Sequence, residues 1–284
     1  MAERRARKSS PAKIGRFAGK LVLVGAGNMG GAMLDGWIAR GLAPDKIVVI
    51  EPSPPKFVKA LTRKGLALNP GKLPKEKDIA AIVVAIKPQA APEALPPIAA
   101  AAGQAPVISI MAGRTIGFLE QTFSRSSPVV RAMPNLPASI GEGITVACGN
   151  DNVGRKLRDF ATSLLAAVGA VEWVGDEHLM DAVTATSGSG PAYVFLLAET
   201  MTKAAIAAGL PAELAARLVR ETVAGSGALL RASPLDAMTL RKNVTSPGGT
   251  TAAALAVLMG PGDLEAVMER AIAAATRRSR ELAG

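Results

Sequence analysis

Cysteine, histidine and aromatic residues are scarce in this sequence. Its 284 residues include one cysteine, Cys148, and one histidine, His178, and aromatic residues make up 3% of the chain. A single cysteine excludes an intrachain disulfide and a cysteine-based structural zinc site, and it fits a reducing cytoplasm. The sequence supports neither a Ser-His-Asp triad nor a metal-ligand cluster, and we expect His178 to be a surface residue.

Long hydrophobic runs are absent as well. No stretch of 18 apolar residues occurs, so we expect no membrane span. Hydrophobic residues nevertheless make up 49% of the chain and charged residues 20%, which allows a sizeable core. The length suits two domains.

The net charge of +10 is concentrated at the amino end. Residues 1–20 carry seven basic and one acidic residue, a net of +6, whereas the remaining residues carry 26 basic and 22 acidic ones, a net of +4. The body of the chain also lacks an aromatic-rich basic stripe, so we expect no nucleic-acid partner. We interpret residues 1–19 as a basic, disordered tail, with a transit peptide or a weak anion-binding arm as alternatives.

Apolar strands alternate with helical patterns in the first part of the chain. Strands are predicted at residues 20–24, 47–50, 79–86, 107–110 and 129–133, and two more at 144–147 and 171–174. Ala- and Leu-rich helices replace them later in the chain. The pattern predicts an α/β fold, with a doubly wound sheet domain over residues 20–174 and an all-α domain over residues 175–284.

The first predicted strand runs into Gly25-x-Gly27-x-x-Gly30, with Asn28 and Met29 opening the next helix. In a dinucleotide fingerprint these glycines permit a tight turn, close approach of backbone to pyrophosphate and close helix–strand packing. The strand–turn–helix context strengthens the interpretation. The alternative is a glycine-rich turn that matters only for packing.

Glu51 ends the second predicted strand, 21 residues after Gly30. A carboxylate there accepts hydrogen bonds from the ribose of NAD and repels a 2′-phosphate. Ser53 and Lys56 follow at once and suit that phosphate. The sequence therefore leaves NAD(H) and NADP(H) both open, and the alternative interpretation of Glu51 is a solvated strand-end charge.

Several motifs together resemble the pyrroline-5-carboxylate reductase family, in order from about residue 21 to the carboxyl end. They are Gly25-Ala-Gly-Asn-Met-Gly-Gly-Ala-Met33, Ile86-Lys87-Pro88-Gln89, Val107-Ile-Ser-Ile-Met-Ala-Gly113, Arg131-Ala-Met-Pro-Asn135, Ser187-Gly-Ser-Gly-Pro-Ala-Tyr193 and Leu240-Arg-Lys-Asn-Val-Thr-Ser-Pro-Gly-Gly-Thr-Thr251. The resemblance implies a Rossmann domain, a helical domain that forms homodimers or multiples of them, and reduction of 1-pyrroline-5-carboxylate to proline by NADPH or NADH.

The resemblance also implies site residues. It adds Ile86, Lys87, Pro88 and Asn135 to the cofactor site, although Lys87-Pro88 would equally end a strand. Substrate contacts fall on Ser187 and Ser189, at a segment expected to open a helix, and on Ser246, Gly248, Gly249, Thr250 and Thr251. A helix start with two glycines suits a carboxylate, whereas N-capping by Ser246 or Thr250 is the plainer interpretation. Thr251 is the catalytic candidate, because the family residue at this position contacts the ring nitrogen.

Three other functions compete with this one. A related reductase of the β-hydroxyacid dehydrogenase type would use a lysine of the helical domain as general acid, and Lys203 is the main lysine there. A non-catalytic NADP-binding sensor would keep the fingerprint alone. A nucleic-acid-binding protein would rest on the basic tail.

The tail is expected to be dispensable for catalysis, because its composition predicts disorder. Deleting residues 2–18 should leave kcat/KM within about threefold, well below the tenfold change that ~1.4 kcal/mol represents. Steady-state kinetics of the truncated and full chains check this. A larger loss would mean that the tail helps to build the site.

Overall fold

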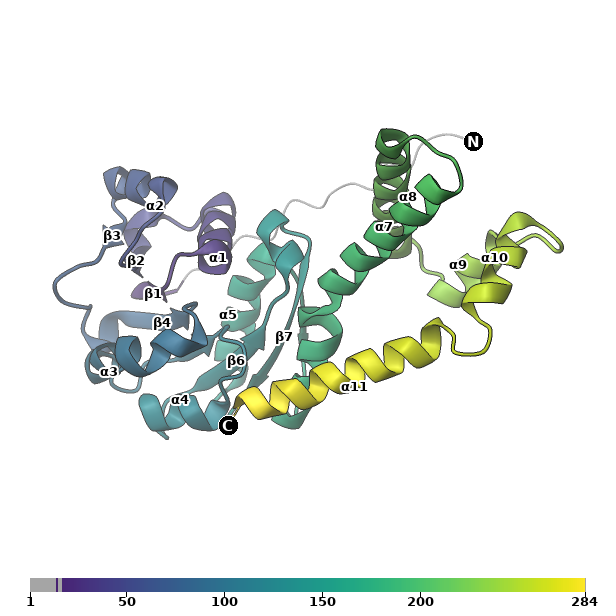
Figure 1. Cartoon of the computed structure of the whole chain (residues 1–284). Helices are drawn as coiled ribbons and strands as arrows, with labels where there is room; N and C mark the ends of the chain where they lie inside the picture. The colour runs from purple at the N-terminus through teal and green to yellow at the C-terminus, as the bar shows by residue number, and fades with distance from the viewer. Residues whose placement is uncertain (1–13, 15–16, 284) are drawn as a thin grey trace. The chain divides into compact units, whose positions relative to one another are not determined.

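The computed structural model describes residue 14 and residues 17–283 (Figure 1). Most of the predicted tail, residues 1–19, therefore lies outside the described residues. Residues 14, 17–189 and 275–283 form one compact unit, and residues 190–274 form a second. The sheet of the first unit ends at Trp173, but the compact unit continues to Ser189 and takes in residues 275–283, so the division lies later than the boundary expected at residue 174.

One eight-stranded sheet organises the first unit, in the order β3-β2-β1-β4-β5-β6-β7-β8. Neighbouring strands are parallel except β6 and β7, which the short segment between them joins as an antiparallel pair. The strands are β1 (Lys20–Val24), β2 (Ile47–Ile50), β3 (Ala67–Leu68), β4 (Ile79–Val84), β5 (Val107–Ser109), β6 (Val129–Met133), β7 (Gly143–Gly149) and β8 (Gly169–Trp173).

The predicted α/β class is confirmed, with differences at the strand ends. Strand β4 ends two residues before the predicted run of residues 79–86, because that run continues into the loop after the strand. Strand β3 was not predicted, since two residues carry no usable pattern.

Helices cover both faces of the sheet, as β1 illustrates. Its Leu21 and Leu23 pack into one hydrophobic cluster and its Val22 and Val24 into another, because side chains alternate between the two faces of a strand. The helices of this unit are α1 (Asn28–Ala39), α2 (Lys56–Leu61), α3 (Ala91–Ala102), α4 (Ile116–Thr122), α5 (Arg155–Leu165) and α6 (Met180–Val183). Helix α1 buries Met33, Leu34 and Trp37.

Short helical turns complete the first unit. The 3-10 turns are η1 (Pro44–Lys46), η2 (Thr62–Lys64), η3 (Glu76–Asp78), η4 (Pro88–Ala90), η5 (Leu136–Ile140), η6 (Ala166–Val168) and η7 (Glu177–Leu179), and η8 (Thr184–Gly188) is a π-helix.

The second unit is helical, as predicted. It contains α7 (Gly190–Ala207), α8 (Ala212–Ala232), α9 (Ala237–Asn243), α10 (Thr250–Leu258) and the first part of α11 (Leu264–Ala283). Gly and Pro residues lie in the connections between these helices, among them Gly209, Pro211, Pro234 and Gly248. No helix of the described residues has the length and apolar composition needed to cross a membrane.

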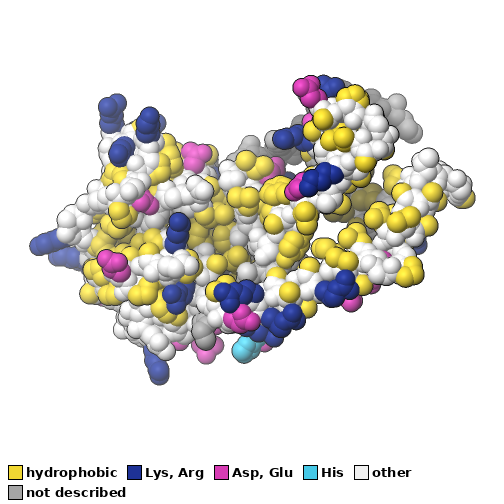
Figure 2. Space-filling view, viewed as in Figure 1, with side chains coloured by type: hydrophobic (Ala, Val, Ile, Leu, Met, Phe, Trp, Pro, Cys, Tyr) yellow, Lys and Arg dark blue, Asp and Glu magenta, His cyan; other side chains and the backbone are white. Residues whose placement is uncertain are grey.

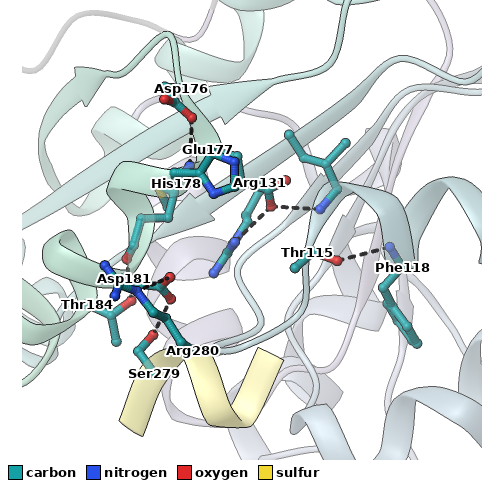
Figure 3. Close-up of polar contacts among 12 residues, drawn as sticks. Thr115, Phe118, Arg131, Asp176, Glu177, His178, Asp181, Thr184, Ser279 and Arg280 are labelled. Carbon is teal, nitrogen blue, oxygen red and sulfur yellow. Dashed lines mark hydrogen bonds and ion pairs between the residues drawn. The ribbon is translucent and has the colours of Figure 1, made fainter. Parts of the chain in front are cut away.

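A polar network ties together distant segments of the first unit (Figure 3). The Oε1 atom of Glu177, in η7, accepts hydrogen bonds from Arg131 Nη1 and from the Ile116 amide, both at 2.8 Å. Arg131 lies on β6 and is only 4% exposed. Asp181 of α6 accepts a hydrogen bond of 2.7 Å from the Oγ atom of Ser279, which lies on α11 near the carboxyl end of the chain. Glu177 therefore neutralises a buried cation and joins β6 to the start of α4.

We predict that Glu177→Gln lowers the free energy of unfolding by about 1–3 kcal/mol, because it leaves the buried Arg131 cation without its counter-charge. Urea denaturation at one fixed protein concentration measures this. Glu172→Gln is the matched control, since Glu172 is an exposed residue of β8. Equal stabilities of the two variants would contradict a stabilising role for the ion pair.

The second unit exposes many large apolar side chains. Phe195 and Leu196 of α7 are each 58% exposed and Leu229 of α8 is 56% exposed, while Ala215 and Val219 are its buried apolar residues. Such surfaces are typical of large, hydrophobic subunit interfaces. We therefore predict a dimer, or a multiple of one, in light scattering at assay concentration. A fully active monomer would contradict this.

Candidate cofactor and substrate sites

A cleft of about 950 Å³ lies at the carboxyl edge of the sheet. It opens between the ends of β1 and β4, where the strand order reverses direction. Ligands of open α/β sheets bind at such a switch point. The cleft is lined by Val24, Gly25, Gly27, Ile50, Glu51, Pro52, Pro70, Gly71, Lys72, Leu73, Pro74, Lys75, Ala85, Ile86, Lys87, Ala90, Ala94, Pro97, Ile98 and Ala101.

The fingerprint glycines have distinct roles in this cleft. Gly25 has a φ of +92°, and a Cβ atom there would lie 2.7 Å from the Ala85 carbonyl oxygen. A Cβ at Gly30 would lie 2.2 Å from the Gly25 carbonyl oxygen. At Gly27, by contrast, a Cβ would meet nothing within 4 Å. The open space at Gly27 is room into which a pyrophosphate fits.

Helix α1 begins beside that space. Its first residues are Asn28 and Met29, and no side chain caps its amino end. The backbone N–H groups of its first turn and the positive end of the helix dipole therefore favour an anion. The residues present fit a dinucleotide.

Glu51 lines the cleft, and its carboxylate is held by backbone. Its Oε2 accepts a hydrogen bond of 2.8 Å from the Ala26 amide, and its Oε1 accepts one of 2.9 Å from the Ser53 amide. Ser53 and Lys56, the other two residues expected near the ribose, are exposed beside it. The three residues are neighbours, but only the carboxylate contacts the fingerprint loop.

The segment after β4 borders the cleft through Ile86 and Lys87. Strand β4 already ends at Val84, so Pro88 is not needed to break it. Instead Pro88 begins η4, and its carbonyl accepts a hydrogen bond of 3.0 Å from Arg114 Nη2. The guanidinium of Arg114 lies 4.5 Å from the centre of the Phe118 ring. These contacts help to hold the segment after β4 in place.

Asn135 follows β6 at the same edge of the sheet but does not line the cleft. It precedes η5, and its Oδ1 accepts a hydrogen bond of 3.0 Å from the Ile144 amide. The side chain thus holds the turn between β6 and β7.

The sequence motifs did not indicate the opposite wall of the cleft. It is formed by residues 70–75, including Lys72 and Lys75, and by an apolar face of α3 with Ala94, Ile98 and Ala101. The helical spacing of those α3 residues and the turn residues Pro70 and Gly71 are the signals that point to this wall.

Ser187 lies in the π-helix η8, and Ser189 directly follows it. The expectation that this segment simply opens a helix needs correction, because α6 continues through the π-helix η8 into α7. Ser187 Oγ donates to the Val183 carbonyl at 3.0 Å, and the Ser189 amide donates to the Thr184 carbonyl at 2.8 Å. Single π turns inside helices occur frequently at functional sites.

In the second unit, the segment from Ser246 to Thr251 forms a turn and the start of α10. Gly248 has a φ of +69°, and the Gly249 amide donates to the Ser246 carbonyl at 3.1 Å. The interpretation that Ser246 or Thr250 caps α10 is wrong. Gly249 occupies the cap position without a side-chain hydrogen bond, and Thr250 is the first residue of the helix. Thr250 is exposed, whereas Thr251 is half-buried.

Three other reactive side chains are poorly placed for acid–base catalysis: Cys148, His178 and Lys203. Burial and, to a smaller extent, the nearby Glu177 carboxylate raise the pKa of the Cys148 thiol to about 12. His178 is exposed, as expected. Lys203, the general-acid candidate of the competing reductase, forms an ion pair with Glu199 on the exposed side of α7. Among the described residues no group of three or more His, Cys, Asp or Glu side chains is arranged to hold a metal ion.

Two family models match the chain. One, described as pyrroline-5-carboxylate reductase dimerisation, matches residues 177–282. The other, described as NADP oxidoreductase, coenzyme F420-dependent, matches residues 20–113. Together they cover the fingerprint and the helical region.

Similar proteins extend over nearly the whole chain. The pyrroline-5-carboxylate reductase of Pseudomonas aeruginosa is 36% identical over 265 residues, which span 93% of this chain and 97% of the relative. That of Haemophilus influenzae is 37% identical over 266 residues, 92% of this chain and 97% of the relative.

Solved structures agree with these matches. A pyrroline-5-carboxylate reductase from Coxiella burnetii has a TM-score of 0.85 and 32% identity, over 94% of this chain and all (100%) of that one. A Plasmodium falciparum pyrroline carboxylate reductase with NADP bound has a TM-score of 0.75 and 29% identity, over 93% and 98% of the two chains. The resemblance predicted from the motifs is confirmed, and this chain belongs to the pyrroline-5-carboxylate reductase family.

Proposed function

We propose that this protein reduces 1-pyrroline-5-carboxylate to L-proline with NADH or NADPH, the last step of proline biosynthesis. The observation that carries the proposal is the phosphate cradle at Gly25, Gly27 and the start of α1, in a chain of this family. The relatives at 36% and 37% identity are named for this activity, and each matches this chain over 97% of its own length.

The chain's contribution to the cofactor is binding and orientation. The first turn of α1 holds the pyrophosphate, with Gly27 leaving the space for it, and Glu51 faces the ribose. Ile86 and Lys87 border the cofactor along the cleft, Pro88 supports them, and Asn135 shapes the neighbouring turn. The bound nicotinamide supplies the hydride for the imine carbon, while the imine nitrogen carries the proton.

The substrate carboxylate is assigned to the start of α10. The backbone N–H groups of its first turn have no side-chain cap, and two glycines precede them, so an anion has open access. Ser246, Gly248, Gly249 and Thr250 shape this turn. The hydroxyl of Thr251 holds the ring nitrogen, and Ser187 and Ser189 complete the substrate contacts. No side chain needs to act as a general acid, because a protonated imine brings its own proton.

Two further assignments follow from composition. A cytoplasmic location fits a chain with one buried cysteine thiol. The mild net charge outside residues 1–20 supports a small-molecule partner rather than a nucleic acid.

The test of this function is direct. Purified protein is mixed with NADH or NADPH and pyrroline-5-carboxylate, and the absorbance of the reduced cofactor is followed. Substrate-dependent loss of absorbance with proline as product is the expected result. Cofactor binding without turnover would favour the sensor interpretation instead.

We predict that Thr251→Ala lowers kcat/KM by roughly 5–150-fold, the equivalent of ~1–3 kcal/mol, because the ring nitrogen of the substrate loses its hydrogen-bond partner. Cofactor affinity, measured by fluorescence, should barely change, since the fingerprint belongs to the other unit. Thr251→Ser keeps the hydroxyl and should restore most of the activity.

Thr250→Ala is the matched control for this experiment. Thr250 is exposed and provides no cap to α10, so its removal should have a smaller effect than that of Thr251. A crippled Thr250→Ala beside a normal Thr251→Ala would show that the roles are reversed. If neither variant matters, the substrate is not held by this loop.

A further inference from the structure

We propose that Glu51 makes this enzyme prefer NADH to NADPH, and that Asn69 is the positioning residue that holds Glu51 in place. The inference deepens the function proposed above, because it names the cofactor that the same cleft takes. It is carried by a set of hydrogen bonds around one residue at the end of β2.

The Glu51 carboxylate has a fixed position. One oxygen accepts from the Ala26 amide of the fingerprint loop at 2.8 Å, and the other accepts from the Ser53 amide at 2.9 Å. Each carboxylate oxygen has a second lone pair that remains for a ligand hydroxyl. A carboxylate held against the fingerprint loop at the end of the second strand is placed to accept both ribose hydroxyls of NADH.

Asn69 clamps the backbone of the same residue. Its Oδ1 accepts a hydrogen bond from the Glu51 amide, and its Nδ2 donates one to the Glu51 carbonyl, both at 2.8 Å. Asn69 adopts a φ of +45°, the one positive φ outside glycine in the described part of the chain. Its own amide donates to the Val49 carbonyl at 2.8 Å. Glu51 is thus held by four hydrogen bonds, two to its carboxylate and two to its backbone.

The left-handed backbone of Asn69 supports this role. Asparagine tolerates that conformation better than most residues, but it still costs free energy relative to the ordinary regions. Such conformations persist where the surrounding structure requires them, and they cluster at ligand-binding sites. Here the conformation directs the side-chain amide across from β3 to β2.

Basic side chains, whose charge is opposite to that of Glu51, lie in the same region. Lys72 and Lys75 line the cleft from the loop before β4, and Lys56 begins α2. Figure 2 shows Lys and Arg side chains gathered over α2 and that loop. These lysines are exposed, and the structure gives Lys56, Lys72 and Lys75 no hydrogen bond or ion pair within the described residues.

A fixed anion outweighs mobile cations at the ribose. The exposed lysines are screened by salt and solvent, and they attract the pyrophosphate of both cofactors alike. A 2′-phosphate, with a charge of about −1.5 to −2, would instead face a carboxylate that is held by two hydrogen bonds, on a residue whose backbone is held by two more. The difference between the two cofactors is therefore determined by Glu51.

Calorimetric binding of ADP-ribose and of 2′-phospho-ADP-ribose tests the proposal without any imine substrate. The unaltered enzyme should bind ADP-ribose about tenfold more tightly or better. Glu51→Gln should weaken ADP-ribose and strengthen the phosphorylated ligand, each by about tenfold. Glu93→Gln removes the same charge from an exposed position of α3 and should leave the ratio unchanged.

Asn69→Gly tests the positioning role, because glycine keeps the left-handed backbone but removes the clamp. The ratio of the two affinities should fall several-fold. The ratio of kcat/KM for NADH and NADPH should follow the affinities in every variant.

Two results would overturn the proposal. One is tighter binding of the phosphorylated ligand by the unaltered enzyme. The other is an equal weakening of both ligands by Glu51→Gln, which would mean that Glu51 only supports the loop. Because the ligands bind without turnover, these outcomes are distinct from failure of the reductase function itself.

Discussion

The close contact between the Gly25 turn and the end of β4 is the constraint on which the cofactor site depends. The Ala85 amide donates to the Val24 carbonyl at 2.7 Å, and the Gly25 amide donates to the Ile50 carbonyl at 2.8 Å. The ends of β1, β2 and β4 are therefore joined through backbone alone. A side chain at Gly25 would push them apart, and with them the helix start that receives the pyrophosphate.

Two kinds of electrostatic groups meet in the resulting cleft. Backbone N–H groups and the Glu51 carboxylate are fixed in direction and are little affected by salt. The lysines of the opposite wall are exposed and act over a longer range. Fixed groups discriminate between ligands because they do not rearrange, whereas mobile ones mainly attract any anion. In the function proposed above, the site would combine general attraction for a dinucleotide with a selective contact at its ribose.

The helical unit presents the opposite situation. Its apolar side chains are largely exposed in the single chain, and its functional turn at Gly248 and Gly249 consists mostly of backbone. Burial of that apolar surface requires a partner, which agrees with the family description of the region as a dimerisation domain. The buried Arg131–Glu177 pair gives the first unit a rigid point just before the chain leaves it.

How much of this was visible in the sequence depends on how far apart the interacting residues lie. The strands, the fingerprint and the helical second half were predicted from local patterns, because periodicity and glycine spacing act within one element. The motifs likewise identified the family. Strand β3 was missed and the capping of α10 by Ser246 or Thr250 was misassigned, since two-residue strands and helix caps depend on small local choices of backbone.

Only the tertiary structure determined which distant residues meet. Asn69 contacts Glu51 across 18 positions and Glu177 reaches Arg131 across 46, and nothing in the spacing of these residues indicates either contact. The same holds for Lys72 and Lys75, which lie opposite the fingerprint because β3 is placed at the edge of the sheet. The sequence by itself determined the elements and the cofactor class, because both depend on short-range pattern. Register, strand order and loop closure determined the partners of each side chain, because those depend on the packing of the whole unit.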